Sequence, residues 1–316
     1  MNKSLVLVGA TASGKSDVAI ALANNSLKTE IISLDSMQIY KGMEIGTGVV
    51  PVLDRKGISH HMTSMVDPKN EYNVKEFQSD VYSILESKIE SKFILVGGTG
   101  LYTHAVVDGY AFAPSSSSAR QSIIDDYGLD EKNPNETNVQ VAYAKLKEVD
   151  GEAAEKIDPK NVRRIIRALE AVEVSGELFS SSGDGVQTFG KPKIDVEIIG
   201  LRYSREVLRA RIVARIKQML SNGWIDEVKM LLPIWAEMVA PAQNAIGYIQ
   251  IHDWINRGEK RSELPELREL IINKTAQFSR RQRKWFERDP RITWIECDNI
   301  GMDKIIEIAS KKADFL

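Results

Sequence analysis

The sequence predicts an α/β fold in which a parallel sheet carries an inserted helical domain. Three short apolar runs, over residues 4–8, 30–34 and 93–96, have the length and composition of buried strands. Segments with helical spacing lie between these runs, and strands that alternate with helices form parallel sheets with ligand sites at the carboxyl ends of the strands. The third observation is a change to polar, helical sequence after Pro114, which marks the insertion.

The order of the elements follows from these patterns. The first run ends in a glycine-rich turn, and the residues after Lys15 have apolar positions at helical spacing. An amphipathic helix is predicted over residues 74–89, and the third run ends in the glycine turn 97–100. After the insertion, the predicted elements are a strand over 194–201, helices over about 204–290 and an edge strand over 292–296.

The insertion divides the chain into two predicted domains. The core comprises residues 1–113 and 189–316, and the inserted helical domain comprises residues 114–188. The clearest helix of the insertion has Asp158 as its N-cap, Pro159 at its first position and Gly176 just past its end. These residue types are typical of the two helix termini.

Composition limits the class of protein. The 316 residues are 43% hydrophobic and 27% charged, which is typical of a folded chain, and the formal net charge is −2. The only cysteine is Cys297, so an internal disulfide framework is excluded. No apolar run is long enough to span a bilayer, so we expect no membrane partner. The N-terminus also lacks a signal-peptide pattern, and we therefore expect a cytoplasmic protein.

The strongest motif matches the phosphate-loop pattern G-x-x-x-x-G-K-[ST] at every fixed position. It consists of Gly9, Ala10, Thr11, Ala12, Ser13, Gly14, Lys15 and Ser16. The glycines let backbone amides turn inward, and the helix that follows adds a positive partial charge. Lys15 supplies an ammonium group, and Ser16 supplies a hydroxyl that suits Mg²⁺. The motif therefore predicts a polyphosphate site on a core like that of the P-loop nucleoside triphosphate hydrolases.

Asp35 directly follows the second apolar run, so it is predicted at the same edge of the sheet as the phosphate loop. It could organise magnesium, as acids do in nucleotide hydrolases, or act as a general base near the phosphates. The third strand ends in glycine rather than in an acid, and Asn273-Lys274 is not followed by the aspartate of the guanine-reading pattern N-K-x-D. These two features disfavour a GTPase switch.

Seven segments of the chain resemble bacterial tRNA dimethylallyltransferases in order and approximate spacing. They are GATASGKS, ISLDSMQIYKGMEIGTG, SHHM, VGGTGLY, DPKNVRRIIRALE, AIGY and SRRQRKWF. The resemblance implies transfer of a dimethylallyl group from its pyrophosphate to the exocyclic amine of the adenosine at tRNA position 37, beside the anticodon, with Mg²⁺ as cofactor. The implied partners are dimethylallyl pyrophosphate and the tRNA anticodon stem-loop, and we expect a monomer.

This reaction needs a base and a stabilised leaving group. The lone pair of the adenine amine is delocalised into the ring, so a carboxylate that removes the proton lowers the barrier, and Asp35 is the candidate. Charge on the departing pyrophosphate can be neutralised by loop amides, Lys15, magnesium on Ser16, and arginines. Arg211 and Arg215 lie one turn apart on a predicted helix and have the planar groups that suit phosphate oxygens. The resemblance implies that Arg215 is catalytic.

The resemblance also assigns Thr11 to catalysis, through pyrophosphate contact. A base that is stacked in an RNA loop must be extruded before it can react. The residues implied to contact the extruded base are Asp35, Ser36, Met37, Gln38 and Thr99. Among them, Gln38 has the amide needed to read a base edge, whereas methionines such as Met37 more commonly pack in a core.

Basic side chains are predicted to grip the RNA backbone. The candidates in the insertion are Arg120, Arg163, Arg164 and Arg167, of which the last three lie off the apolar stripe of their helix. A second basic cluster surrounds Trp285 and Phe286, and these two aromatic residues could pack inward or meet RNA. This cluster comprises Arg280, Arg281, Arg283, Lys284 and Arg288.

The chain departs from the family pattern in two places. Ala10 stands where the family commonly has proline, which leaves the amide cradle unchanged. After Thr47, the sequence continues Gly48-Val49-Val50, where many relatives have alanine, lysine and proline, so any phosphate contact of that lysine is lost. His60 and His61 match the family, but a metal site is disfavoured because no further histidine or cysteine lies nearby in the sequence.

Three other interpretations fit parts of the pattern. A small-molecule kinase would hold ATP in the phosphate loop and use Asp35 to activate a hydroxyl. An RNA-binding module related to ATPases would use the basic faces without catalysing transfer. An enzyme that prenylates free adenylate would share the loop and Asp35 but have less use for the basic helix of the insertion.

Overall fold

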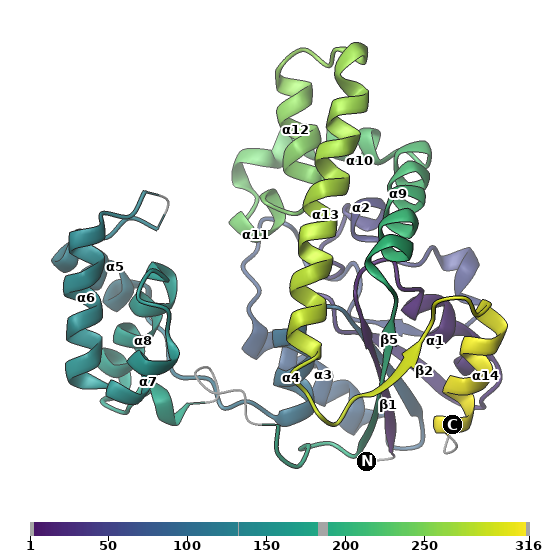
Figure 1. The fold of residues 1–316 in the computed structure, drawn as a ribbon, viewed down its shortest axis with the longest axis horizontal. Coiled ribbons are helices and arrows are strands. Elements are labelled where there is room, and N and C mark those ends of the chain that lie inside the picture. Colours follow the sequence, from purple (N-terminus) through teal and green to yellow (C-terminus); the bar gives the residue numbers. More distant parts are fainter. Residues whose placement is uncertain (1–2, 132, 183–188, 314–316) are drawn as a thin grey trace. The chain divides into compact units, whose positions relative to one another are not determined.

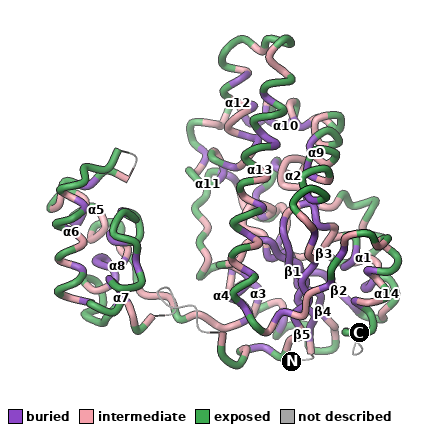
Figure 2. The backbone as a smooth tube through the Cα atoms, in the orientation of Figure 1, coloured by how far each residue is buried: buried purple, intermediate pink, exposed green. Residues whose placement is uncertain are grey.

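The computed structural model describes residues 3–131, 133–182 and 189–313, which form two compact units (Figure 1). The core unit comprises Met1–Gly109 and Lys191–Leu316, and the inserted unit comprises Tyr110–Gly190. The predicted boundary at residue 188 lies outside the described residues. Each unit buries its own cluster of hydrophobic side chains, as the burial pattern in Figure 2 shows.

The core unit contains a six-stranded parallel sheet with the order β3-β2-β4-β1-β5-β6. The strands are β1 (Ser4–Gly9), β2 (Thr29–Ser33), β3 (His60–His61), β4 (Lys92–Gly97), β5 (Val196–Arg202) and β6 (Thr293–Glu296). The predicted fold class is confirmed, and β6 is the edge strand predicted over 292–296. The two-residue strand β3 forms the other edge and was not predicted, because a pair of histidines carries no strand pattern.

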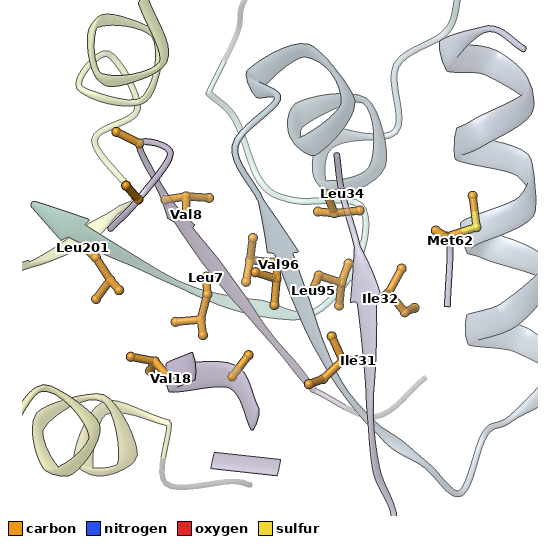
Figure 3. Packing of buried hydrophobic residues seen from close by; sticks show 14 of the residues in the cluster. Leu7, Val8, Val18, Ile31, Ile32, Leu34, Met62, Leu95, Val96 and Leu201 are labelled. Atoms are coloured by element: carbon orange, nitrogen blue, oxygen red, sulfur yellow. The ribbon is translucent and has the colours of Figure 1, made fainter. Parts of the chain in front are cut away.

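Buried aliphatic side chains make this sheet a rigid platform. Figure 3 shows Leu95 and Ile32 on two adjacent strands, and Val18 of the first helix beside Leu7 of β1. These four residues are fully buried, and full burial of such a side chain contributes roughly 1.5–3 kcal/mol. The loops at the carboxyl ends of the strands are therefore anchored to a fixed base.

Helices cover the sheet and extend beyond its carboxyl edge (Figure 1). Those in the first half of the core unit are α1 (Lys15–Asn24), α2 (Glu44–Thr47), α3 (Val74–Ser87) and α4 (Gly100–Asp108), with a 3₁₀ turn at Val52–Arg55. Those in the second half are α9 (Arg205–Ser221), α10 (Trp224–Leu231), α11 (Ala240–Gln243), α12 (Tyr248–Asn256), α13 (Leu264–Phe286) and α14 (Met302–Lys312), with 3₁₀ turns at Leu232–Glu237 and Arg261–Glu263. The helical stretch predicted over 204–290 is thus several helices, broken where Gly223 and Gly247 adopt φ of 95° and 93°.

The inserted unit is helical, as predicted for this part of the chain. Its helices are α5 (Ser117–Tyr127), α6 (Glu136–Val149), α7 (Gly151–Lys156) and α8 (Val162–Ser175), followed by a 3₁₀ turn at Phe179–Ser181. The predicted N-cap of α8 is wrong. Asp158 and Pro159 form a turn in which the Asp158 carbonyl accepts the Asn161 amide at 2.8 Å. Asn161 then caps the helix by accepting the Arg164 amide. The predicted end is correct, since Gly176 has φ of 70°.

Candidate active site

The phosphate loop joins β1 to α1 and is closed by its own lysine. The Lys15 ammonium donates to the carbonyls of Gly9 and Ala10, both at 2.8 Å. Burial, with a smaller contribution from Arg215, lowers the pKa of Lys15 to about 7 against the opposing effect of Asp35. An anionic ligand would offer this cation a stronger partner than two neutral carbonyls. The loop is therefore arranged to receive a negatively charged group.

A glutamine from α13 links the phosphate loop to the second glycine turn. The side-chain oxygen of Gln282 accepts the Thr11 amide at 2.8 Å, and its nitrogen donates to the Gly98 carbonyl at 2.8 Å. A Cβ at Gly98 would lie 2.5 Å from the Gln282 nitrogen, so a larger residue there would displace this amide. The sequence interpretation missed Gln282. The available signal was its position on the buried face of α13 with Ser279 and Phe286, where an uncharged amide interrupts a run of cations.

Asp35 lies two residues beyond the buried end of β2, close enough to Lys15 of the phosphate loop for the two charges to interact. Its carboxylate accepts the Met37 amide at 2.8 Å. Burial raises the pKa of the Asp35 carboxyl, although the Met37 amide and the Lys15 ammonium oppose the shift. A carboxylate with a raised pKa holds a proton more firmly, which suits a general base.

The residues after Asp35 are fixed by neighbouring loops. The Ser36 amide donates to the Thr99 hydroxyl at 3.3 Å. Gln38 donates to the carbonyls of Thr47 and Gly48 at 3.2 and 3.1 Å, so it would have to exchange these bonds to read a base. Met37 packs partly against the core, yet it also lines a cavity.

Two arginines of α9 reach the site in different ways. Arg211 donates to the Ala12 carbonyl at 2.7 Å and lies over the Tyr203 ring, 4.8 Å from its centroid. Arg215 makes no hydrogen bond or ion pair with any residue that the structure describes. Burial lowers the pKa of Arg215, and the nearby Asp35 opposes the shift. A partly buried guanidinium with no hydrogen bond or ion pair of its own is a strong anchor for an anion.

Two cavities of the core unit meet at these residues. One, of about 1090 Å³, is lined by the phosphate loop and the segment 44–56, and we name it the phosphate cavity. The other, of about 360 Å³, is mostly apolar, and we name it the apolar cavity. Its apolar lining includes Met37, Ile212, Ile216, Met219, Trp224, Tyr248 and Phe278. The walls shared by both cavities are Thr11, Asp35, Thr47, Arg215, Met219 and Phe278. An acid and a cation thus lie where an anion site adjoins an apolar one.

Close packing of Gly48 on Arg215 provides a test of this geometry. Gly48 has φ of 70°, and a Cβ there would lie 1.9 Å from an Arg215 nitrogen. We expect Gly48→Ala to displace the guanidinium and to lower any turnover at this site by about 100-fold, the cost of misplacing a group by roughly 1 Å.

The matched control for Gly48→Ala is Gly258→Ala. Gly258 also has a positive φ, of 98°, but a Cβ there would meet nothing within 4 Å. Both variants carry the strain of an alanine at positive φ, of order 1 kcal/mol, which thermal unfolding measures. Equal turnover in the two variants would show that the contact with Arg215 is unimportant.

The arginines of the inserted unit are partly engaged in ion pairs. Arg120 pairs with Glu131 and Glu170. Arg163 also pairs with Glu131, although its side chain is 80% exposed. Arg167 donates to the carbonyls of Ala113 and Pro114, whereas Arg164 is exposed. The basic face is therefore held in place by carboxylates, with Arg163 and Arg164 the most accessible to a ligand.

The aromatic residues of the second basic cluster pack inward. The Trp285 indole donates to His104 at 3.0 Å, and Phe286 is fully buried.

The histidine pair of the SHHM segment forms the edge strand β3, where His61 bonds to Glu30. His60 lines the phosphate cavity, and its Nδ1 lies 2.9 Å from the Ile58 carbonyl.

The oxygen donors of Ser16 and of the phosphate cavity are of the kind that binds Mg²⁺. Ser16 lines this cavity beside Asp35, and Mg²⁺ commonly combines one or two such protein oxygens with substrate phosphates and water. No cluster of three or more histidine, cysteine, aspartate or glutamate side chains suited to a metal occurs within residues 3–131, 133–182 and 189–313. Over the same residues, every helix is too short or too polar to cross a bilayer.

Comparison with known proteins relates this site to a family. A family model described as IPP transferase matches residues 38–289, and one described as isopentenyl transferase matches residues 2–58. A tRNA dimethylallyltransferase of Nocardioides sp. is 37% identical over 313 residues, covering 98% of this chain and 96% of that protein. A tRNA dimethylallyltransferase of Symbiobacterium thermophilum is 36% identical over 318 residues, covering 98% and 95%.

Solved structures show the same fold. A tRNA isopentenylpyrophosphate transferase of Bacillus halodurans superimposes with a TM-score of 0.68 at 30% identity, covering 100% of this chain and 98% of that chain. A eukaryotic dimethylallyltransferase acting on tRNA gives a TM-score of 0.76 at 24% identity, covering 98% of this chain and 79% of that chain.

Proposed function

The chain belongs to the tRNA dimethylallyltransferase family, and we propose that its phosphate loop holds dimethylallyl pyrophosphate while Asp35 activates the adenosine of the tRNA. The protein is a prenyltransferase that modifies tRNA, as its relatives' names and the family models indicate. The target is the exocyclic amine of adenosine at position 37, in the anticodon stem-loop. The observation that carries the proposal is the position of Asp35 and Arg215 in the wall shared by the phosphate cavity and the apolar cavity.

The proposed reaction is a substitution at the first carbon of the dimethylallyl group. The amine nitrogen forms a bond to that carbon, and the bond from the carbon to the pyrophosphate oxygen breaks. The pyrophosphate leaves with the electron pair of the broken bond, and the amine proton passes to the Asp35 carboxylate. The raised pKa of Asp35 lets it accept this proton.

The leaving group is stabilised by cations that are already in place. Lys15 and Arg215 both line the phosphate cavity, and Arg211 supports the loop through the Ala12 carbonyl. Fixed charges in a site that excludes water stabilise developing charge more strongly than water does. Magnesium on Ser16, when bound, would supply further positive charge to the pyrophosphate.

The apolar cavity suits the extruded base. Its aromatic and aliphatic walls can stack on a purine, and it adjoins Asp35, Ser36 and Thr99. We assign the binding of the anticodon stem-loop backbone to the arginines of the inserted unit. We also propose that one chain suffices for activity, and that the enzyme works in the cytoplasm with its tRNA.

Because the arginines of the inserted unit are assigned to the RNA phosphates, we expect tRNA binding to weaken steeply as the salt concentration increases. Each phosphate contact contributes about −0.7 to −0.9 to the slope of log K against log salt, because binding releases counterions. We expect Arg163→Gln to reduce this slope by about one contact. Filter binding over a salt series measures the slope, and a flat response in the unmodified protein would exclude the basic face as the RNA grip.

Product analysis tests the proposed function. The protein is incubated with dimethylallyl pyrophosphate, Mg²⁺ and either tRNA or AMP, and the nucleosides are analysed by mass spectrometry. The proposal requires a mass increase of one dimethylallyl group on adenosine of the tRNA, mapped to position 37. Modification of AMP alone would indicate an adenylate prenyltransferase, and ATP turnover without prenylation would indicate a kinase or ATPase.

A further inference from the structure

A buried glutamate of α10 lies behind the active site, where it contacts the loop at Ile45 and Gly46 and the side chain of Tyr248. Glu227 is 3% exposed, and its carboxylate accepts the amides of Ile45 and Gly46 at 2.7 and 3.1 Å. It also accepts the hydroxyl of Tyr248 at 2.6 Å. Three donors thus converge on one carboxylate, which an ionised, acceptor-only group satisfies.

The loop held by Glu227 contains the turn of α2 and ends at Gly48. Met43 precedes this helix and offers no side-chain cap, so Glu227 takes that role from a distant part of the chain. The Gly46 amide also donates to the Tyr248 hydroxyl at 3.0 Å. On its other side, the loop is fixed by Gln38, which bonds to the carbonyls of Thr47 and Gly48.

This loop forms part of the seat of Arg215. The backbone of Gly48 packs against the guanidinium so closely that a Cβ would lie 1.9 Å from one of its nitrogens. Arg215 makes no hydrogen bond or ion pair within the described part of the chain, so packing has to hold it in position. A shift of the loop would therefore move the cation that faces the leaving group.

We infer that Glu227 is a positioning residue for transfer: by fixing the amides of Ile45 and Gly46, it holds the loop that seats Arg215. The inference rests on the proposed role of Arg215 at the pyrophosphate. An amide at position 227 would turn its NH₂ group toward at least one of the three donors and lose that bond. The variant would therefore bind both substrates, but its loop would no longer hold the Arg215 guanidinium in position.

The test compares Glu227→Gln with a matched control, Glu30→Gln. Glu30 is a partly buried carboxylate with several partners, namely Lys88, Ser91 and His61. It lies on β2, five residues before Asp35, and lines neither cavity. We expect Glu227→Gln to lower kcat by about 100-fold, with the KM values for tRNA and dimethylallyl pyrophosphate within about threefold of the unmodified enzyme. Glu30→Gln should keep kcat within about twofold of the unmodified enzyme, because this substitution leaves the packing of the active site unchanged.

A double-mutant cycle separates positioning from a general loss of structure. If Glu227 acts through Arg215, adding Glu227→Gln to Arg215→Ala lowers kcat by less than about twofold relative to Arg215→Ala alone. The guanidinium that Glu227 helps to position is already absent from that variant. Tyr248→Phe, which removes one of the three donors, should give a smaller loss and serves if Glu227→Gln folds poorly. Additive losses in the cycle, or unchanged kcat in Glu227→Gln, would overturn the inference. Absence of transfer by the unmodified protein would instead overturn the proposed function.

Discussion

Replacing Asp35 with alanine is expected to abolish prenyl transfer while leaving tRNA affinity nearly unchanged. A positioned general base typically contributes about 10²- to 10⁴-fold to rate, and the Asp35 carboxylate is the acid group in the wall shared by the two cavities. Single-turnover transfer with saturating dimethylallyl pyrophosphate measures the chemical step, and filter binding measures the affinity for tRNA.

Asp35→Asn is the companion variant, because it keeps the shape of the side chain and an oxygen for the Met37 amide. We expect it to be as inactive as Asp35→Ala, since an amide cannot take the proton. The two variants together distinguish a role of Asp35 in proton transfer from a role in stabilising the turn that it forms with Met37. Full activity in Asp35→Asn would assign Asp35 to the structure of the turn rather than to catalysis.

Lys15→Met is expected to produce the second large loss, of about 10²- to 10³-fold in kcat/KM for dimethylallyl pyrophosphate, because it removes one preorganised donor to the leaving group. The pKa of Lys15 is about 7, and an adjacent pyrophosphate would raise it. Binding above pH 7 therefore takes up a proton, so affinity should fall by up to about tenfold per pH unit as pH rises.

Calorimetry in buffers of different ionisation enthalpy measures this proton uptake. The unmodified protein should take up close to one proton per pyrophosphate at pH 8, and Lys15→Met should take up much less. A pH-independent affinity in the unmodified protein would show that Lys15 is charged before the ligand binds or does not contact the ligand.

Local patterns predicted the fold well where side chains act through burial or backbone conformation. The apolar runs identified the main strands because buried parallel strands are continuously hydrophobic. The start of α8 was wrong because Asp158-Pro159 and Asn161 are both plausible caps, and tertiary context decides between them. The helical stretch after residue 204 was not resolved into separate helices, although Gly223 and Gly247 mark two of its breaks.

The site could be predicted only in part for a related reason. A phosphate loop is contiguous, so its eight residues carry their own signal. Gln282 and Glu227 act on loops 271 and about 180 residues away in the chain, and no local spacing indicates such contacts. Gln38 matched a base-reading residue by type, yet its amide is occupied by Thr47 and Gly48, which only the folded chain reveals.

The proposed ligand of the phosphate loop is a prenyl pyrophosphate rather than a nucleotide. Equilibrium titration of dimethylallyl pyrophosphate and of ATP, each with Mg²⁺, into the same protein distinguishes the two ligands. We expect dimethylallyl pyrophosphate to bind at least about tenfold more tightly, a difference of about 1.4 kcal/mol, and Arg215→Ala to weaken its binding. Tighter binding of ATP, with no competition from dimethylallyl pyrophosphate, would show that the loop is a nucleotide site.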